Sequence, residues 1–284
     1  MTCPACGATE WRARRVLEAL LVLRCAACGM LRSEIRSQDA ISYAQVDDAA
    51  YESAIGALRR SQAVEVLRFA APHATRGDWL DVGCGPGYLL SEARGAGFRV
   101  RGIEPDAKAA ELARARLGAD AVRHDVFREA EDGSADVLST LDVLEHVPVA
   151  ELADFASRVR RTLRDGGVWV IKVPSSEGLF FRVAHALRLR PQIERLWQVD
   201  HAWPHTVYFA RATLTAFLQR HGFDVVAHRY LAEVPLRSAV ARLTMLGNVP
   251  RWQAMLALPA IAGVNAVEWV RRKSDALVVV ARPR

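Results

Sequence analysis

"LDVGCGPGYLL", residues 80–90, places three glycines at alternate positions directly after a short apolar run. Gly83, Gly85 and Gly87 would let a ligand approach the bare backbone, as in loops that cradle phosphates. Asp81, however, stands at the start of this loop, and its carboxylate would repel a pyrophosphate. The spacing is also GxGxG and not the GxGxxG of dinucleotide-binding loops. The loop therefore predicts a ligand that carries positive charge.

Strands and helices alternate on both sides of this loop. We expect helices at 51–71, 88–96 and 106–117, and a further helix through Val149 and Leu163 that ends at Gly166-Gly167. The expected strands are 79–82, 98–103, 121–124, 135–140 and 168–173, the last as a continuous apolar run. Strands that are apolar on both faces and alternate with helices indicate a parallel α/β sheet between two helical layers. Ligands bind such sheets beyond the carboxyl ends of the strands, where the chain places Asp81–Gly87, Glu104, Asp125 and Leu141–His146.

S-adenosylmethionine (SAM) fits both features of the loop. It has no phosphate, and it carries an ammonium and a sulfonium cation beside one carboxylate. Asp81 can hold the ammonium directly or through water, while the glycines let the backbone approach the methionine and ribose parts. Glu104 follows 23 residues later, at the end of the next strand, and can accept both ribose hydroxyls. NAD sites share an acid at that spacing, so only its combination with Asp81 and GxGxG indicates SAM.

Four stretches in this order, "LDVGCGPG", "GIEPD", "DVLEHVP" and "LRDGGVWVIKVPS", resemble the class I SAM-dependent methyltransferases. The branch they resemble most includes the ubiquinone-biosynthesis O-methyltransferases, over residues 51–232 and again in "ALVVVARP". The resemblance implies a Rossmann-like, seven-stranded, mostly parallel sheet whose final strands are "FDVVAHRYL" and an antiparallel "ALVVVARP". It also implies the cofactor contacts: Asp81, Gly83, Gly85 and Gly87 at the methionine part, Glu104 at the ribose, Asp125 with Val126 at the adenine, and Leu141 near the sulfonium.

Two CxxC pairs, Cys3/Cys6 and Cys25/Cys28, lie 18 residues apart, each followed by a glycine. This spacing is typical of a zinc ribbon, in which two tight turns supply four thiolates to one structural ion. A segment of about 35 residues is too short to fold by core burial alone. Redox disulfides and buried free cysteines are the alternatives. The ribbon resembles appendages on certain sugar methyltransferases and on a ribosomal RNA guanine methyltransferase.

These patterns divide the chain of 284 residues. We expect a zinc ribbon at 1–36, a helical linker and N-terminal helix at 37–75, and a SAM-dependent methyltransferase domain at 76–284 with an inserted segment at about 235–274. The first residues lack the apolar core of a signal peptide, and no uncharged stretch reaches the 18 or so residues that cross a bilayer. We therefore expect a cytoplasmic protein.

Three histidines are candidates for the reaction itself. His146, in "LEHV", follows the fourth strand, and His201 and His205 lie in "DHAWPHTVYF", a segment that resembles the family's acceptor side. An imidazole there can remove a proton from a hydroxyl acceptor or orient it. The alternative for His146 is a cap or packing role at the next helix, and Glu145 can make a structural hydrogen bond or contact the acceptor.

The acceptor side is apolar and basic. "GLFFRVAHALRLR" puts Leu179, Phe180, Val183 and Leu187 on one helical face. Residues 252–267 are uncharged and precede Arg271, Arg272 and Lys273, but they are too short to span a bilayer. We expect this segment to be a lid or a homodimer interface buried in protein, with peripheral membrane contact as the alternative.

The sequence thus predicts methyl transfer to a small molecule, at a hydroxyl of a sugar, glycan intermediate, quinone-like compound or secondary metabolite. The first alternative is an RNA methyltransferase that binds nucleic acid through the ribbon and the last third of the chain, which holds 15 basic and 6 acidic residues. The chain lacks an "NPPY"-type loop and a dense basic stripe with interleaved aromatics, which argues against it. The second alternative is a SAM-binding scaffold without catalysis.

Overall fold

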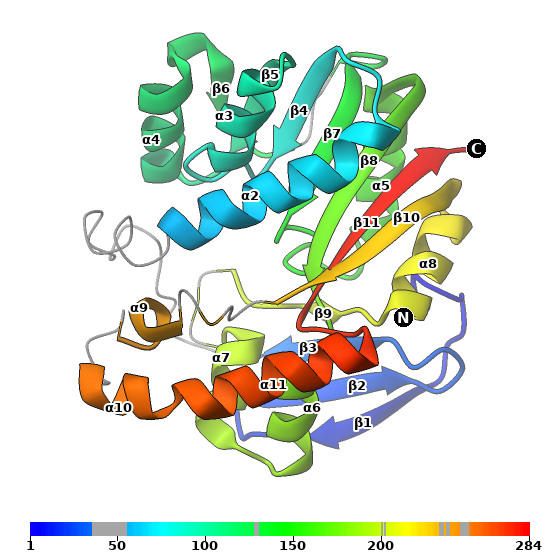
Figure 1. Cartoon of the computed structure of the whole chain (residues 1–284). Helices are drawn as coiled ribbons and strands as arrows, with labels where there is room; N and C mark the ends of the chain where they lie inside the picture. Colours follow the sequence, from blue (N-terminus) through cyan, green and yellow to red (C-terminus); the bar gives the residue numbers. More distant parts are fainter. Residues whose placement is uncertain are drawn as a thin grey trace.

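The computed structural model describes residues 1–35, 56–127, 131–199, 201, 203–232, 236, 239–244 and 250–284. Its centre is a seven-stranded sheet in the order β10-β11-β8-β7-β4-β5-β6 (Figure 1). The strands are β4 (Asp78–Val82), β5 (Arg99–Glu104), β6 (Val122–His124), β7 (Ala135–Leu141), β8 (Leu163–Pro174), β10 (Phe223–Leu231) and β11 (Ala276–Pro283). Neighbouring strands from β6 to β8 run parallel, whereas β11 is antiparallel to both β8 and β10. The predicted Rossmann-like fold is confirmed.

Helices cover both faces of this sheet. On one face, α2 (Ala57–Ala70), α3 (Tyr88–Gly95) and α4 (Ala107–Leu117) pack around the buried Trp79 of β4. On the other face, α5 (Leu152–Thr162) and α8 (Arg211–Arg220) pack around the buried Trp169 of β8. The two indoles thus lie in the cores on opposite faces of the sheet.

One predicted boundary was wrong. The helix expected to continue through Leu163 to Gly166-Gly167 ends at Thr162, and Leu163 is the first residue of β8. Leu163 pairs with Ala135 of β7 and is buried, so its place in an apolar pattern satisfies helix and strand equally. Residues 51–55 of the first expected helix and the linker at 37–55 lie outside the described residues.

The N-terminal segment forms a second, smaller sheet. β1 (Trp11–Arg15), β2 (Leu20–Cys25) and β3 (Leu31–Ile35) pair in antiparallel fashion. A fourth strand, β9 (Val207–Tyr208), comes from the large domain and pairs with β3. The N-terminal segment is therefore joined to a segment of the large domain by main-chain hydrogen bonds.

The remaining helices gather beside the small sheet (Figure 1). α6 (Leu179–Ala186) and α7 (Arg190–Trp197) follow β8, whereas α9 (Ala239–Thr244), α10 (Arg251–Leu256) and α11 (Leu258–Arg271) lie between the last two strands. Short 3-10 turns occur at Ala71–His73 and Ala119–Ala121. By length and composition alone, the 21 residues Arg251–Arg271 could cross a bilayer, so the expectation that 252–267 is too short underestimated the helix.

Candidate active site

The glycine loop connects β4 to α3 at the carboxyl edge of the sheet. Gly83, Gly85 and Gly87 all have positive φ angles, of 69°, 51° and 80°, a region that side chains other than glycine rarely enter. A Cβ on Gly83 would lie 2.5 Å from Val143, and one on Gly87 would lie 2.9 Å from Leu117. A Cβ on Gly85 would meet nothing within 4 Å. Gly83 and Gly87 are thus also required by packing, while Gly85 faces open space.

Two buried acids flank this loop. Asp81 on β4 is 3% exposed, and Glu104 at the end of β5 is 7% exposed. Glu104 accepts hydrogen bonds from the backbone N–H of Gly85 at 2.7 Å and of Asp106 at 2.8 Å. These bonds fix the carboxylate beside the loop, and each oxygen keeps a second lone pair for another donor.

Burial dominates the titration of both acids. It raises the pKa of Asp81 to about 7, against a lowering hydrogen bond from Ser139 and with a further raising effect of the charge on Glu104. Burial likewise raises the pKa of Glu104, although its backbone hydrogen bonds oppose the shift. Ser139 donates to Asp81 at 2.5 Å and itself accepts from the indole of Trp79 at 2.8 Å. Burial disfavours the ionised form of both acids, so a cationic ligand beside them would favour ionisation.

The other predicted cofactor contacts lie along the same edge. Asp125 follows β6, and its N–H donates to the carbonyl of Glu104 at 3.1 Å. Its carboxylate accepts from the N–H of Val126 at 2.7 Å, and Val126 is 39% exposed. Leu141 is the half-buried last residue of β7. The topology therefore brings all eight predicted cofactor residues to the carboxyl ends of four adjacent strands.

The acceptor-side candidates meet beyond the end of β7. The carbonyl of Glu145 accepts from the N–H of Thr206 at 2.7 Å and from its hydroxyl at 3.0 Å. His146 and His205 then lie with their ring centroids 4.8 Å apart. Side-chain ligand atoms of Glu145, His146 and His205 all lie within 4.8 Å of one another. A carboxylate and two imidazoles are side chains of the kind that bind a divalent cation.

Hydrogen bonds define the tautomers of both histidines. Nδ1 of His146 lies 3.2 Å from the carbonyl oxygen of Pro204, which can only accept, so Nδ1 carries the proton and Nε2 the lone pair. Nδ1 of His205 lies 3.3 Å from the hydroxyl of Tyr208, which donates to Leu196 and therefore accepts from His205. Burial lowers the pKa of His146 and lowers that of His205 to about 3. Both imidazoles are therefore neutral at pH 7.

His201 differs from these two. Its side chain is exposed, and its backbone N–H donates to Gln198 at 3.0 Å. Its charge lowers the pKa of both His146 and His205, so it lies near them without joining the buried pair. Of the three predicted histidines, the structure thus places His205 in the interior, His146 half-buried beside it and His201 on the surface.

The sequence of residues 56–228 matches the family model described as "Methyltransferase domain". The chain belongs to this family. A probable S-adenosylmethionine-dependent methyltransferase of Mycolicibacterium smegmatis is 30% identical over 164 residues, 57% of this chain and 58% of the relative. A ubiquinone biosynthesis O-methyltransferase of Thiobacillus denitrificans is 35% identical over 98 residues, 32% of this chain and 41% of the relative. The chain thus spans about half the length of these curated relatives.

A solved structure of a SAM-dependent methyltransferase from Archaeoglobus fulgidus has the same fold. It matches with a TM-score of 0.52 and 17% identity, and the match covers 78% of this chain and 93% of that one. The predicted SAM-dependent methyltransferase is therefore confirmed at the level of family and fold. The acceptor is left open by these relatives.

The methyltransferase domain holds one group of charged residues that sequence reasoning missed. Lys172 of β8 is 1% exposed, and its Nζ lies 2.7 and 2.8 Å from the two carboxylate oxygens of Asp142. Arg59 of α2 reaches the same carboxylate at 2.5 Å. Asp142 follows β7 with a positive φ of 56°. The signal was present as one lysine inside the run expected to be continuously apolar.

The four cysteines of the methyltransferase converge as the spacing predicted. Sγ atoms of Cys3 and Cys28, and of Cys6 and Cys25, are 3.6 Å apart, and all four lie within 4.8 Å of one another. Sulfurs around a tetrahedral zinc lie about 3.8 Å apart, given Zn–S bonds of about 2.3 Å. The glycine after each pair has a φ of 79°, which closes the turn. The arrangement suits one structural zinc ion.

The N-terminal segment also contacts the segment that carries His205, which the sequence predicts to lie on the acceptor side. Ser33 of β3 donates from its hydroxyl to the carbonyl of His205 at 2.7 Å and from its N–H to Thr206 at 2.9 Å. Leu31 and Arg32 pair with Tyr208 and Val207 of β9. Cys3, Cys25 and Met30 belong to the same core as Leu214 and Phe217 of α8. This docking depends on pairing between distant segments, which no local pattern in the sequence reveals.

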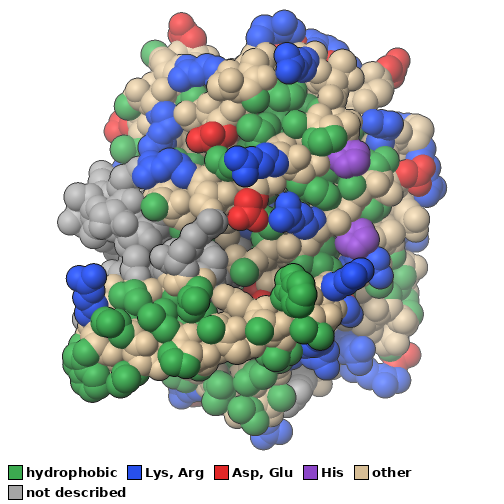
Figure 2. Space-filling model, viewed as in Figure 1, with side chains coloured by type: hydrophobic (Ala, Val, Ile, Leu, Met, Phe, Trp, Pro, Cys, Tyr) green, Lys and Arg blue, Asp and Glu red, His purple; other side chains and the backbone are tan. Residues whose placement is uncertain are grey.

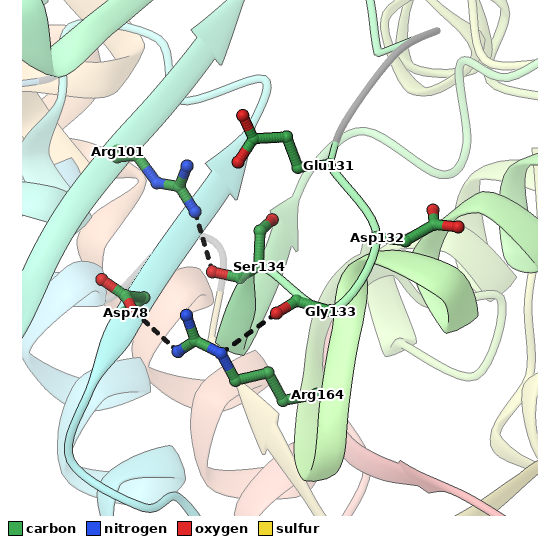
Figure 3. Close-up of a pocket in the computed structure, with 7 residues that line it drawn as sticks. All are labelled: Asp78, Arg101, Glu131, Asp132, Gly133, Ser134 and Arg164. Atoms are coloured by element: carbon green, nitrogen blue, oxygen red, sulfur yellow. Dashed lines mark hydrogen bonds and ion pairs between the residues drawn. The ribbon is translucent and has the colours of Figure 1, made fainter.

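A surface pocket lies away from this site, at the amino ends of the strands (Figure 3). Arg164 contacts Asp78 at 2.7 Å and the carbonyl of Gly133 at 3.1 Å, and Arg101 donates to Ser134. Hydrogen bonds from Arg99 and Arg164 hold the pKa of Asp78 well below its usual range. Arg164 of β8 thus pairs with Asp78 of β4 and Asp136 of β7, and these ion pairs line the pocket and connect the three strands.

Proposed function

We propose that this protein transfers a methyl group from SAM to a hydroxyl oxygen of a small-molecule acceptor. The observation that carries the proposal is the fixed tautomer of His146. Its Nδ1–H is bound by the Pro204 carbonyl at 3.2 Å, so Nε2 holds a lone pair beyond the end of β7. A neutral imidazole in this state can accept a hydroxyl proton as the oxygen attacks.

The residues on the cofactor side of the site would bind SAM and orient its methyl group. When bound, SAM supplies a methyl group on a sulfonium, which an acceptor oxygen attacks in line. Asp81 would pair with the ammonium, Glu104 with the ribose hydroxyls, and Asp125 with the adenine. Gly85, whose missing side chain opens space at the loop, would let the backbone approach the ligand.

The acceptor side provides a base within an apolar wall. The ring of His205 packs against Tyr208, which in turn contacts the buried Trp197 and Phe181. His205 is almost fully enclosed and neutral, so we assign it the role of holding its own loop in place. His146 is half-buried, and we therefore expect the acceptor to reach His146. The name of the Thiobacillus relative, an O-methyltransferase, supports an oxygen acceptor.

The ribbon's place supports a small acceptor over RNA. Its strand β3 is paired with β9, and its cysteine turns pack on α8, where His221 contacts the carbonyl of Pro4 at 3.2 Å. The N-terminal segment is thus packed against the large domain through both β3 and its cysteine turns. The ribbon in this arrangement supports the loop that carries His205.

The test combines methyl-labelled SAM with an extract of the producing organism, divided into RNA, lipid and small polar fractions. We expect base-stable label in the lipid or small-molecule fraction, at a rate that falls strongly in the variant His146→Asn. His228→Asn, an exposed histidine on β10, is the matched control and should retain the rate. Label in RNA alone, or SAM binding without any labelled product, would refute the proposal.

A further inference from the structure

The strongest feature outside the active site is an apolar face along α10 and α11. The described residues include fifteen exposed large hydrophobic side chains, and six of them lie here: Trp252, Met255, Leu256, Val267, Trp269 and Val270. Their exposed fractions reach 82% at Trp269 and 71% at Leu256 and Val270. Figure 2 shows hydrophobic side chains gathered over these helices on one side of the molecule. A patch of this kind marks an interaction surface.

The face has an aromatic residue and a cation near each end. Trp252, Met255 and Leu256 are spaced to share one side of the first helix, next to Arg251. Trp269 and Val270 precede Arg271 and Arg272 at the other end. Tryptophan and arginine are the side chains that prefer the boundary between lipid tails and headgroups. The 21-residue segment is thus apolar in the middle and basic at both ends.

The exposed surface of α10 and α11 carries no acidic side chain. Residues 250–267 contain no acid, and the next one, Glu268, is 4% exposed. Lys273 is neutralised by Glu177. Within the described part of the chain, Arg251 and Arg272 form no ion pair with a carboxylate. The face therefore complements a surface that is apolar and negatively charged.

The C-terminal end of α11 is fixed to the protein. Glu268 accepts from the N–H of Leu179 at 2.9 Å and from the hydroxyl of Ser274 at 2.5 Å. Four residues after Arg272, the chain enters β11, which lies between β10 and β8 in the large sheet. The helix is also interrupted at Ala257, because Pro259 has no N–H for the carbonyl of Met255. These constraints keep the segment along the protein surface, where it cannot insert as a straight spanning helix.

The predicted occupants, a lid or a second copy, fit less well. A lid would turn its apolar side toward the active site, whereas these side chains face solvent. In a symmetric dimer built on this face, an antiparallel pair of helices would bring Arg251 of each copy near Arg271 and Arg272 of the other. With no outward acid in 250–267 to compensate, this contact is repulsive.

The neighbouring helix α6 also exposes apolar and basic side chains. Its Phe180 and Val183, and Leu187 just after it, are 44%, 39% and 67% exposed, while Phe181 and Ala184 face inward. Arg182 and Arg188 lie exposed among them. The apolar side predicted for this helix thus points outward.

We propose that α10 and α11, together with the exposed side of α6, bind the surface of a membrane that contains anionic lipid. The helices would lie in the interface plane with Trp252, Leu256 and Trp269 among the acyl chains. Arg251 and Arg272 would contact phosphate groups. This binding is independent of the acceptor's identity.

The experiment uses the full chain and vesicles of phosphatidylcholine with or without phosphatidylglycerol. We expect co-sedimentation with the anionic vesicles, a blue shift of tryptophan fluorescence, and loss of binding at high salt. Trp269→Ser should weaken binding about tenfold, because burial of a large apolar side chain contributes about that factor. Leu112→Ser, on α4, is the matched control and should bind normally.

Charge is tested with the double variant R251Q/R272Q, which should lose the preference for anionic vesicles, whereas Arg68→Gln on α2 should keep it. Unchanged SAM affinity and melting temperature show that the variants fold. Absence of vesicle binding overturns the proposal. The proposal is also overturned if sedimentation equilibrium shows a dimer that Trp269→Ser converts to a monomer. It is overturned as well if membrane-bound protein resists alkaline extraction, because that result indicates a spanning helix.

Discussion

The pKa of Asp81 makes SAM affinity depend on pH. In the free protein, burial raises this pKa to about 7, so the carboxyl is about half protonated at neutral pH. A carboxylate that pairs with the ammonium of SAM must be ionised. Protein with a protonated Asp81 then does not bind, so the apparent Kd equals the intrinsic Kd divided by the ionised fraction. For a pKa of about 7, the apparent Kd is about 1.1 times the intrinsic Kd at pH 8 and about 11 times the intrinsic Kd at pH 6.

Isothermal titration calorimetry of SAM at pH 6, 7 and 8 measures this effect. We expect about tenfold weaker binding at pH 6 than at pH 8, with release of about half a proton per site at pH 7. Asp81→Asn should bind weakly with no such slope, while Asp120→Asn, a remote exposed carboxylate, should keep it. Equal affinity at pH 6 and pH 8, or a full slope in Asp81→Asn, would refute the reasoning.

Three further predictions concern the acceptor side, the ribbon and the buried ion pair. His146→Asn should lower kcat about 100-fold with unchanged SAM affinity, and full activity would exclude His146 as the base. Zinc chelation, or the variant Cys6→Ser, should expose residues 1–35 to protease. The same treatment should lower kcat/KM for the acceptor while calorimetry shows normal SAM binding. An unchanged cleavage pattern would contradict this prediction. Asp142→Asn should reduce the free energy of unfolding by about 3 kcal/mol in urea titration, whereas Asp224→Asn, which breaks the exposed pair with Arg284, should change it by less than about 1 kcal/mol.

The cofactor edge could be predicted because its determinants are local. Glycines at alternate positions specify a loop of positive φ. Asp81 and Glu104 lie at the carboxyl ends of two strands that pair in parallel, so their side chains reach the same edge of the sheet. The two CxxC pairs were informative for the same reason, since each turn is set within a few residues. Spacing alone carries this information, and no distant contact is needed.

Other features depend on contacts that the chain makes far away. The periodicity of α6 identified an apolar side, but not that Phe181 would face inward and Phe180 outward. Lys172 lies in a run of buried aliphatics, and only the fold reveals Asp142 opposite it. Leu163 is compatible with helix and strand, and pairing with Ala135 decides between them. In each case, tertiary packing determined what the local pattern left open.

Strand sharing between the ribbon and β9 limits how this protein can be shortened. A chain that began at residue 56 would lose β3, leaving the backbone of Val207 and Tyr208 without its partner, and would uncover Leu214 and Phe217 beneath the cysteine turns. Such a fragment would present a bare strand edge beside an apolar surface, a combination that promotes aggregation. Attempts to exchange acceptor loops with other methyltransferases should therefore transfer the cysteine-containing segment 1–35 and residues 201–209 together.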